Sequence, residues 1–125
     1  MLSRENRITR GSDFKSTVRN GRRVGSANSV VYVAPQASPA LTRFGFIVAK
    51  SVGNSVVRHR TTRRLRAIGY RLLPVLPEGR DVIVRALPGC VEVDWDTLLL
   101  EIDRSLQRAI HPAAGRTTSG EVTQR

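Results

Sequence analysis

The sequence predicts an α+β or α/β sandwich in which helices pack against one sheet. Apolar residues recur every three or four positions over residues 57–72 and again over 95–110, which is typical of amphipathic helices. Runs rich in valine, isoleucine and phenylalanine at 29–33, 43–50 and 81–87 are typical of strands. Because each of these elements has an apolar side that must be covered, we expect the helices to cover the sheet.

Length and composition indicate one strongly basic domain. A chain of 125 residues can bury about two-thirds of its unfolded surface in one core, and we place the domain at residues 1–111. Residues 112–125 have few apolar side chains and are expected to form a disordered tail. The formal net charge is +11, and nineteen of the 21 cations are arginine, which is suited to forked contacts with phosphate. The expected partner is therefore nucleic acid, and no small-molecule substrate is expected.

The first helix is predicted over residues 13–19. Ser12 is its expected N-cap, and Asn20-Gly21 ends it. Phe14 and Val18 form an apolar pair on one side of this helix, four residues apart. From its residue type alone, Phe14 is expected to belong to the core.

Two strands are predicted next, at 29–33 and 43–50, with a loop at 35–39 between them. Tyr32 lies in the first of these strands. Core packing with the hydroxyl at the surface explains it as well as an exposed ring that stacks on an RNA base. Lys50 stands at the end of the second strand, where a cation would extend a phosphate-binding surface towards the following helix.

The following helix is expected to begin at Val56, after the N-cap Ser55, and to stop at Pro74. One narrow stripe of this helix is expected to pack on the core, through Val57, Thr61, Leu65, Ile68 and Leu72. Within nine residues the same helix carries five arginines and no acid, namely Arg58, Arg60, Arg63, Arg64 and Arg66. At 100° per residue, one border of the stripe carries Arg60, Arg64 and Arg71, and the opposite face carries His59, Arg63, Arg66 and Tyr70.

A solvated charged face is the simplest explanation of such a helix, but it does not fit this charge pattern. Solvated faces usually mix signs at i,i+3 and i,i+4, whereas the neighbouring arginines here repel each other by a few tenths of a kcal/mol per pair. Arg58 also lies in the first turn, where the helix dipole is already positive. Bound phosphates would turn this repulsion into attraction, so the helix is expected to bind a polyanion.

The last two elements are a strand at 81–87 and a helix that Asp94 or Asp96 caps. The strand is apolar on both faces, which indicates a central or well-covered strand. The helix has one apolar face, which is typical of a helix that packs on the core, and Pro112 ends it.

No catalytic or metal site is expected in this chain. Its acids are grouped only around the last helix, where capping explains Asp94 or Asp96 and an i,i+3 pair with Arg104 explains Glu101. The single cysteine, Cys90, allows no internal disulfide and suits a reducing cytoplasm. No apolar run is long enough to span a membrane, so a soluble cytoplasmic protein is expected.

Residues 53–66, GNSVVRHRTTRRLR, resemble the signature of the bacterial ribonuclease P protein subunit, G-N-A-V-x-R-N-R-x-K-R-x-x-R. The arginine positions of that signature are occupied here by Arg58, Arg60, Arg63 and Arg66. Three positions differ, since Ser55, His59 and Thr62 replace its Ala, Asn and Lys. The resemblance covers most of the first 110 residues. It implies the element order αβββαβα, with the first β region split into two strands, a mixed four-stranded sheet and a left-handed crossover through the arginine-rich helix.

The resemblance also implies a function. In that family, an RNA subunit carries the active site and its Mg²⁺ ions cleave the 5′ leader from precursor tRNA, while the protein binds both RNAs. The residues implied to bind RNA are Lys50, Arg58, His59, Arg60, Arg63 and Arg66. The single-stranded leader is expected in a cleft between the arginine-rich helix and the sheet, with a wall made by Phe14, Val18 and Tyr32. Mg²⁺ is expected to be held mainly by the RNA subunit and the substrate.

Two other classes of function are compatible with the composition. A ribosomal or general RNA-chaperone protein would bind RNA without any place in an enzyme, but composition alone does not explain the ordered signature. A membrane-surface protein would use a basic amphipathic helix. The apolar stripe of the arginine-rich helix is narrow and lacks Trp and Phe, so no membrane partner is expected.

Overall fold

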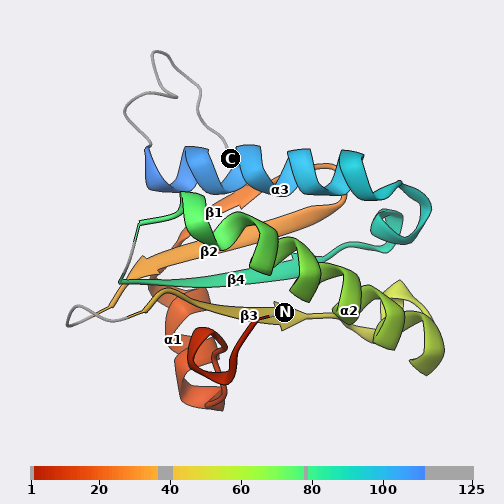
Figure 1. Cartoon of the computed structure of the whole chain (residues 1–125). Helices are drawn as coiled ribbons and strands as arrows, with labels where there is room; N and C mark the ends of the chain where they lie inside the picture. Colours follow the sequence, from red (N-terminus) through yellow and green to blue (C-terminus); the bar gives the residue numbers. More distant parts are fainter. Residues whose placement is uncertain (1, 37–40, 78, 112–125) are drawn as a thin grey trace.

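The computed structural model describes residues 2–36, 41–77 and 79–111 (Figure 1). Its helices and strands are α1 (Gly11–Asn20), β1 (Arg22–Gly25), β2 (Ser29–Pro35), β3 (Arg43–Ile47), α2 (Ser55–Leu72), β4 (Arg80–Ala86) and α3 (Trp95–Ile110). This order is αβββαβα, so the α+β class and the split of the first β region into two strands are confirmed. The predicted tail at 112–125 and most of the loop at 35–39 lie outside the described residues.

The sheet is mixed and has the strand order β1-β2-β4-β3. β2 is antiparallel to both β1 and β4, whereas β3 and β4 are parallel. The central or well-covered position predicted for the strand at 81–87 is confirmed, since β4 lies between β2 and β3 and Val82, Ile83 and Val84 are buried. Parallel neighbours need a crossover connection, and here it runs through α2. The left-handedness of this crossover stays an expectation from the resemblance.

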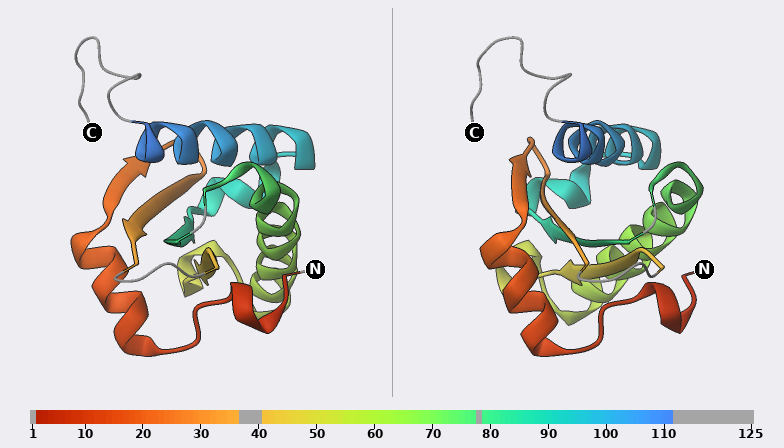
Figure 2. Two further views of the ribbon diagram at one scale, coloured as in Figure 1. Left: turned by 60° about the vertical axis from the view of Figure 1, so that its left-hand side comes forward. Right: turned by 90° about the vertical axis from the view of Figure 1, so that its left-hand side faces the viewer.

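The two faces of the sheet are covered by different helices. α2 and α3 lie on one side of the sheet and α1 lies on the other (Figure 2). Successive side chains of a strand point to opposite faces, so Val31 and Val33 of β2 belong to the cluster under α2 and α3, whereas Val30 and Tyr32 belong to a smaller cluster near α1.

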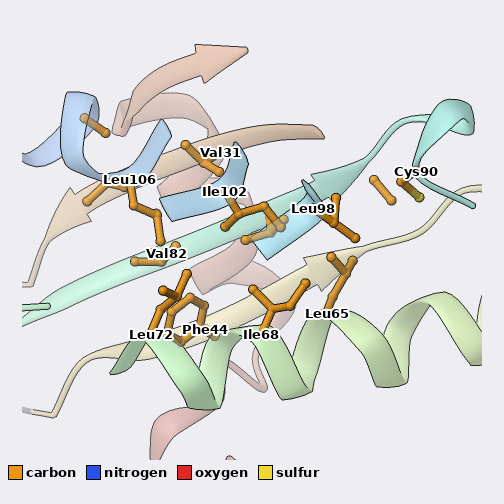
Figure 3. Packing of buried hydrophobic residues seen from close by; sticks show 14 of the residues in the cluster. Val31, Phe44, Leu65, Ile68, Leu72, Val82, Cys90, Leu98, Ile102 and Leu106 are labelled. Carbon is orange, nitrogen blue, oxygen red and sulfur yellow. The ribbon is translucent and has the colours of Figure 1, made fainter. Parts of the chain in front are cut away.

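The larger cluster places α2 by its apolar stripe. Leu65, Ile68 and Leu72 point towards the sheet and belong to one cluster with Phe44, Val82 and Leu98 (Figure 3). The predicted stripe is confirmed, since four of its members are buried and the fifth, at the start of the helix, is half-buried: Thr61, Leu65, Ile68, Leu72 and Val57. The remaining sides of α2 are therefore left for polar contacts.

Several predicted boundaries are wrong by a few residues. α1 begins at Gly11 with Arg10 as its N-cap, so Ser12 lies inside the helix and does not cap it. β3 ends at Ile47, and Lys50 belongs to a short 3₁₀ turn. The predicted end of α1 is confirmed, because the helix stops at Asn20.

Gly21, which follows α1, has an ordinary φ of −77°, so no left-handed backbone is needed there. Glycine suits the position because a Cβ would lie 2.5 Å from the carbonyl oxygen of Thr17 and 3.2 Å from the backbone of Val33. The residue therefore lets α1 approach β2 closely.

Two acids at the start and on the side of α3 stabilise the fold, and one of them has other partners than predicted. Asp94 caps the helix as expected by accepting a hydrogen bond of 2.9 Å from the backbone N–H of Thr97, and hydrogen bonds from Thr97 lower the pKa of Asp94. Glu101 does not pair with Arg104. Its carboxylate instead accepts hydrogen bonds from Ser26 Oγ at 2.9 Å and from the backbone and side-chain nitrogens of Asn28 at 2.9 and 2.8 Å.

Candidate nucleic-acid interface

The start of α2 is fixed by Asn54, one residue before the predicted cap. The side-chain oxygen of Asn54 accepts a hydrogen bond of 2.9 Å from the backbone N–H of Val57, and Ser55 is the first residue of the helix. Gly53 lets the chain enter this turn, since a Cβ there would come within 2.7 Å of the Val57 side chain. Asn54 leaves the other free N–H groups of the first turn available to an anion.

Replacing Asn54 by alanine is expected to lower the free energy of unfolding by about 1 kcal/mol, because one N–H group of α2 loses its acceptor. Ser55→Ala is the matched control and should have a smaller effect, since Ser55 accepts no capping bond. Urea unfolding of both variants measures the difference. A larger loss in Ser55→Ala than in Asn54→Ala would contradict this assignment of the cap.

Five of the six predicted RNA-binding residues come together along the first two-thirds of α2, where the surface is hollowed in two adjoining places. The larger hollow has a volume of about 630 Å³ and is lined by Val48, Ser55, Arg58, His59, Thr62, Arg63 and Arg66. The second, of about 510 Å³, is lined by Ser55, Val56, His59, Arg60 and Arg63. Lys50 lies in the exposed turn before α2 and lines neither hollow.

The cations of this surface have no acidic partner within residues 2–36, 41–77 and 79–111. Arg43 forms ion pairs with Asp13 at 3.4 Å and Asp81 at 2.7 Å, whereas no arginine of α2 forms an ion pair with a described acid. The Nε atoms of Arg58 and Arg66 are buried and have no hydrogen-bond acceptor. α2 contains no acid in its 18 residues, so no carboxylate of this helix offsets the charge of its arginines.

Arg64 differs from the other arginines of α2. Its two terminal nitrogens donate hydrogen bonds to the backbone carbonyls of Cys90 at 3.3 Å and Val93 at 2.9 Å. These bonds join α2 to the turn that precedes α3. The charge run in the sequence included Arg64 with the RNA-facing arginines, whereas the structure gives it a role in the fold.

The predicted leader residues lie elsewhere, in α1 and on the sheet face that α1 covers. Tyr32 is buried with 5% of its surface exposed, and Phe14 packs against the same cluster. Val18 is more accessible, at 37%. The expected cleft between α2 and the sheet is filled by core side chains such as Leu65, because α2 packs directly on the opposite face. The structure thus separates the predicted RNA-binding residues of α2 from the predicted leader-binding residues. The sequence analysis had placed both groups in and around one cleft.

Two further residues that could contribute to a binding surface were given no site role from the sequence. Arg7 lies in the N-terminal segment that bridges to Phe44 at the edge of β3, and its Nε is buried without an acceptor. Tyr70 is 54% exposed on α2. The helical spacing already put Tyr70 on the same side as Arg63 and Arg66, and this was the signal that could have identified it.

The acids and thiol of the described residues do not form a metal site. No group of three or more His, Cys, Asp or Glu side chains there is arranged to hold a metal ion. Asp94 and Glu101 are used in the hydrogen bonds of α3, and Cys90 is buried, with a pKa raised mainly by desolvation. Among the described helices, none combines the length and the apolar character needed to cross a bilayer.

Comparisons with known proteins agree with this geometry. The chain matches the family model described as ribonuclease P over residues 2–110. It is 43% identical over 110 residues to the ribonuclease P protein component of Clavibacter michiganensis subsp. michiganensis, covering 88% of this chain and 97% of the relative. It is 47% identical over 114 residues to the ribonuclease P protein component of Rhodococcus jostii, covering 86% and 91%.

A solved structure shares the fold. The RNase P protein from Thermotoga maritima superposes with a TM-score of 0.73 at 24% identity, over 82% of this chain and 96% of that one. The family model spans nearly all the described residues, and the two relatives are matched along most of their length. The chain therefore belongs to the ribonuclease P protein family.

Proposed function

We propose that this chain is the protein subunit of a cytoplasmic ribonuclease P particle. In that particle it binds the catalytic RNA and the 5′ leader of precursor tRNA, and it assists the Mg²⁺-dependent removal of the leader that gives the mature tRNA 5′ end. Family membership supports this proposal, and so does one observation above all, namely that the arginines lining the hollows of α2 have no acidic partner in the described chain.

The first half of α2 is suited to RNA phosphates in two ways. The helix dipole and the free N–H groups of the first turn attract anions, and Arg58, His59 and Arg60 lie at that end of the helix. Arg63 and Arg66 extend the positive surface by two further turns, with guanidinium groups that can bind phosphate through two parallel hydrogen bonds. Lys50 adds an exposed charge just before the helix.

The leader is proposed to bind on the sheet face next to α1. Val18 offers exposed apolar surface there and Phe14 is half-buried, whereas Tyr32 is buried and would support this surface from within the cluster. Arg23 is directly opposite Tyr32 in the β1–β2 ladder, so its side chain emerges on the same face and is exposed. Stacking and backbone charge read few bases, so weak sequence selectivity is expected.

Mg²⁺ is proposed to be held by the RNA subunit and the substrate, because the described protein side chains do not fit a metal site. The ion would supply the polarisation of the scissile phosphate and the activation of water. The protein's own contribution is electrostatic. Its cations offset the repulsion between two polyanions, which raises substrate affinity and lets Mg²⁺ sites fill at a lower bulk concentration.

Reconstitution with a catalytic ribonuclease P RNA and a precursor tRNA tests this function. The purified chain is expected to lower the Mg²⁺ concentration at which the RNA reaches half of its maximal cleavage rate. A variant with Arg104→Ala and Arg108→Ala, two exposed arginines of α3, is the control for net charge and should act like the wild type.

A general RNA-binding or ribosomal protein would give another result. It would bind unrelated structured RNAs as tightly as the catalytic RNA, and it would leave the Mg²⁺ requirement unchanged. That outcome would overturn the proposed function while leaving RNA binding by α2 intact.

A further inference from the structure

Tyr70 extends the side of α2 that carries His59, Arg63 and Arg66. With 3.6 residues per turn, His59, Arg63, Arg66 and Tyr70 project within a sector of about 60°. Tyr70 is one turn past Arg66, about 6 Å further along the helix axis. Its side chain is 54% exposed, so this side of the helix presents an accessible aromatic ring next to its row of cations.

Packing within the protein does not explain this position. The apolar stripe of α2, which includes Ile68 and Leu72, faces the core, and Tyr70 belongs to neither hydrophobic cluster. In the described part of the chain, the ring stacks on no other ring and the hydroxyl has no hydrogen-bond partner. An isolated exposed aromatic residue is ordinary on a protein surface. Here, however, it is flanked by unpaired cations, and the combination of ring and cation is the one that proteins use on unpaired RNA.

We infer that Tyr70 is a stacking platform for an unpaired base of the catalytic RNA, and that Arg63 and Arg66 hold the phosphates beside that base. This inference rests on the proposed function of α2 as the surface that binds the RNA subunit. It adds that the contacted RNA is single-stranded or bulged at this point, because a base inside a duplex has no free face for the ring. The catalytic RNA is the expected source of the base, since the proposed leader residues lie on the other face of the sheet.

The test measures binding to the catalytic RNA alone, without precursor tRNA. Tyr70→Ala is expected to weaken binding by about 5- to 150-fold, the range for losing one base–aromatic stack. Tyr70→Phe keeps the flat ring and should stay within about twofold of the wild type. Tyr70→Leu keeps apolar surface but not the ring, so it should lose affinity as Tyr70→Ala does. Val75→Ala, at another exposed apolar side chain just past α2, is the control and should bind like the wild type.

The salt dependence of binding separates a stacking role from an ionic one. Tyr70→Ala should leave the slope of log K against log salt unchanged, whereas Arg66→Ala should reduce its magnitude by about 0.7 to 0.9. Equal affinity of Tyr70→Ala and wild type would overturn the inference, as would tight binding by Tyr70→Leu. A loss seen only when precursor tRNA is present would also overturn it, by placing the base in the substrate.

These outcomes also distinguish the inference from the proposed function. If the arginine variants lose affinity and the Tyr70 variants do not, the RNA-binding role of α2 stands and the stacking contact is wrong. If neither set loses affinity, the assignment of α2 to the RNA subunit fails as well.

Discussion

Replacing Arg63 and Arg66 together by alanine is expected to weaken binding to the catalytic RNA by about 100-fold or more, because hydrogen bonds to charged groups contribute about 1.5–3 kcal/mol each. Both side chains line the larger hollow of α2 and have no acidic partner in the described chain. Losing two phosphate contacts should also reduce the salt slope of binding by about 1.4 to 1.8. Filter binding or fluorescence anisotropy at several fixed salt concentrations measures both quantities.

The same double variant should remain folded. Arg63 and Arg66 are three residues apart on one helix, so their removal relieves a like-charge repulsion of a few tenths of a kcal/mol. The matched control removes two exposed arginines of α3, Arg104 and Arg108, and changes the net charge by the same amount. If this control weakened RNA binding as much as the α2 variant, net charge rather than the α2 surface would account for the affinity.

Leu65→Ala is expected to have the opposite effect, a large loss of stability with little change in RNA affinity. Leu65 is 1% exposed and lies where α2 faces the sheet and α3 (Figure 3). Truncating a buried leucine costs about 2–5 kcal/mol, which is a large part of the 5–15 kcal/mol that stabilises a typical domain. Urea or thermal unfolding measures this loss, and RNA binding should be compared below the unfolding transition.

Val56→Ala provides the control for this prediction. Val56 is on the same helix but 64% exposed, so its truncation should change the free energy of unfolding by no more than about 0.5 kcal/mol. An unchanged stability in Leu65→Ala would mean that α2 presents a different side to the core. The cationic surface would then also have to be assigned to different residues.

The sequence was sufficient to predict how α2 is divided between core and solvent. Helix geometry fixes which residues share a side, so the spacing of Leu65, Ile68 and Leu72 determined the buried stripe and left Arg63 and Arg66 on the outside. The central or well-covered position of β4 was also predictable, because its valines and isoleucine cover both faces of the strand.

Other features could not be predicted, because they depend on partners far away in the sequence. Arg64 was one more cation in the run, and only the tertiary structure brought the carbonyls of Cys90 and Val93 to its guanidinium. In the sequence, Arg104 was a plausible partner for Glu101, because it follows three residues later on the same helix. Asn28 offers it two nitrogens from 73 residues away, and that contact exists only because α3 packs over β1 and β2.

The chain by itself therefore determined the two sides of α2, the excess of arginine and the expectation of a polyanionic partner, because charge and helical period are local properties. The tertiary structure decided that Arg64 is bound within the fold while Arg63 and Arg66 have no acidic partner among the described residues, and it packed Phe14 against Tyr32's cluster on the sheet side away from α2. The physical reason is that a side chain's partners are set by how helices and strands pack together. Packing brings together residues that are far apart in the sequence, and their spacing in the sequence does not reveal that they will be in contact.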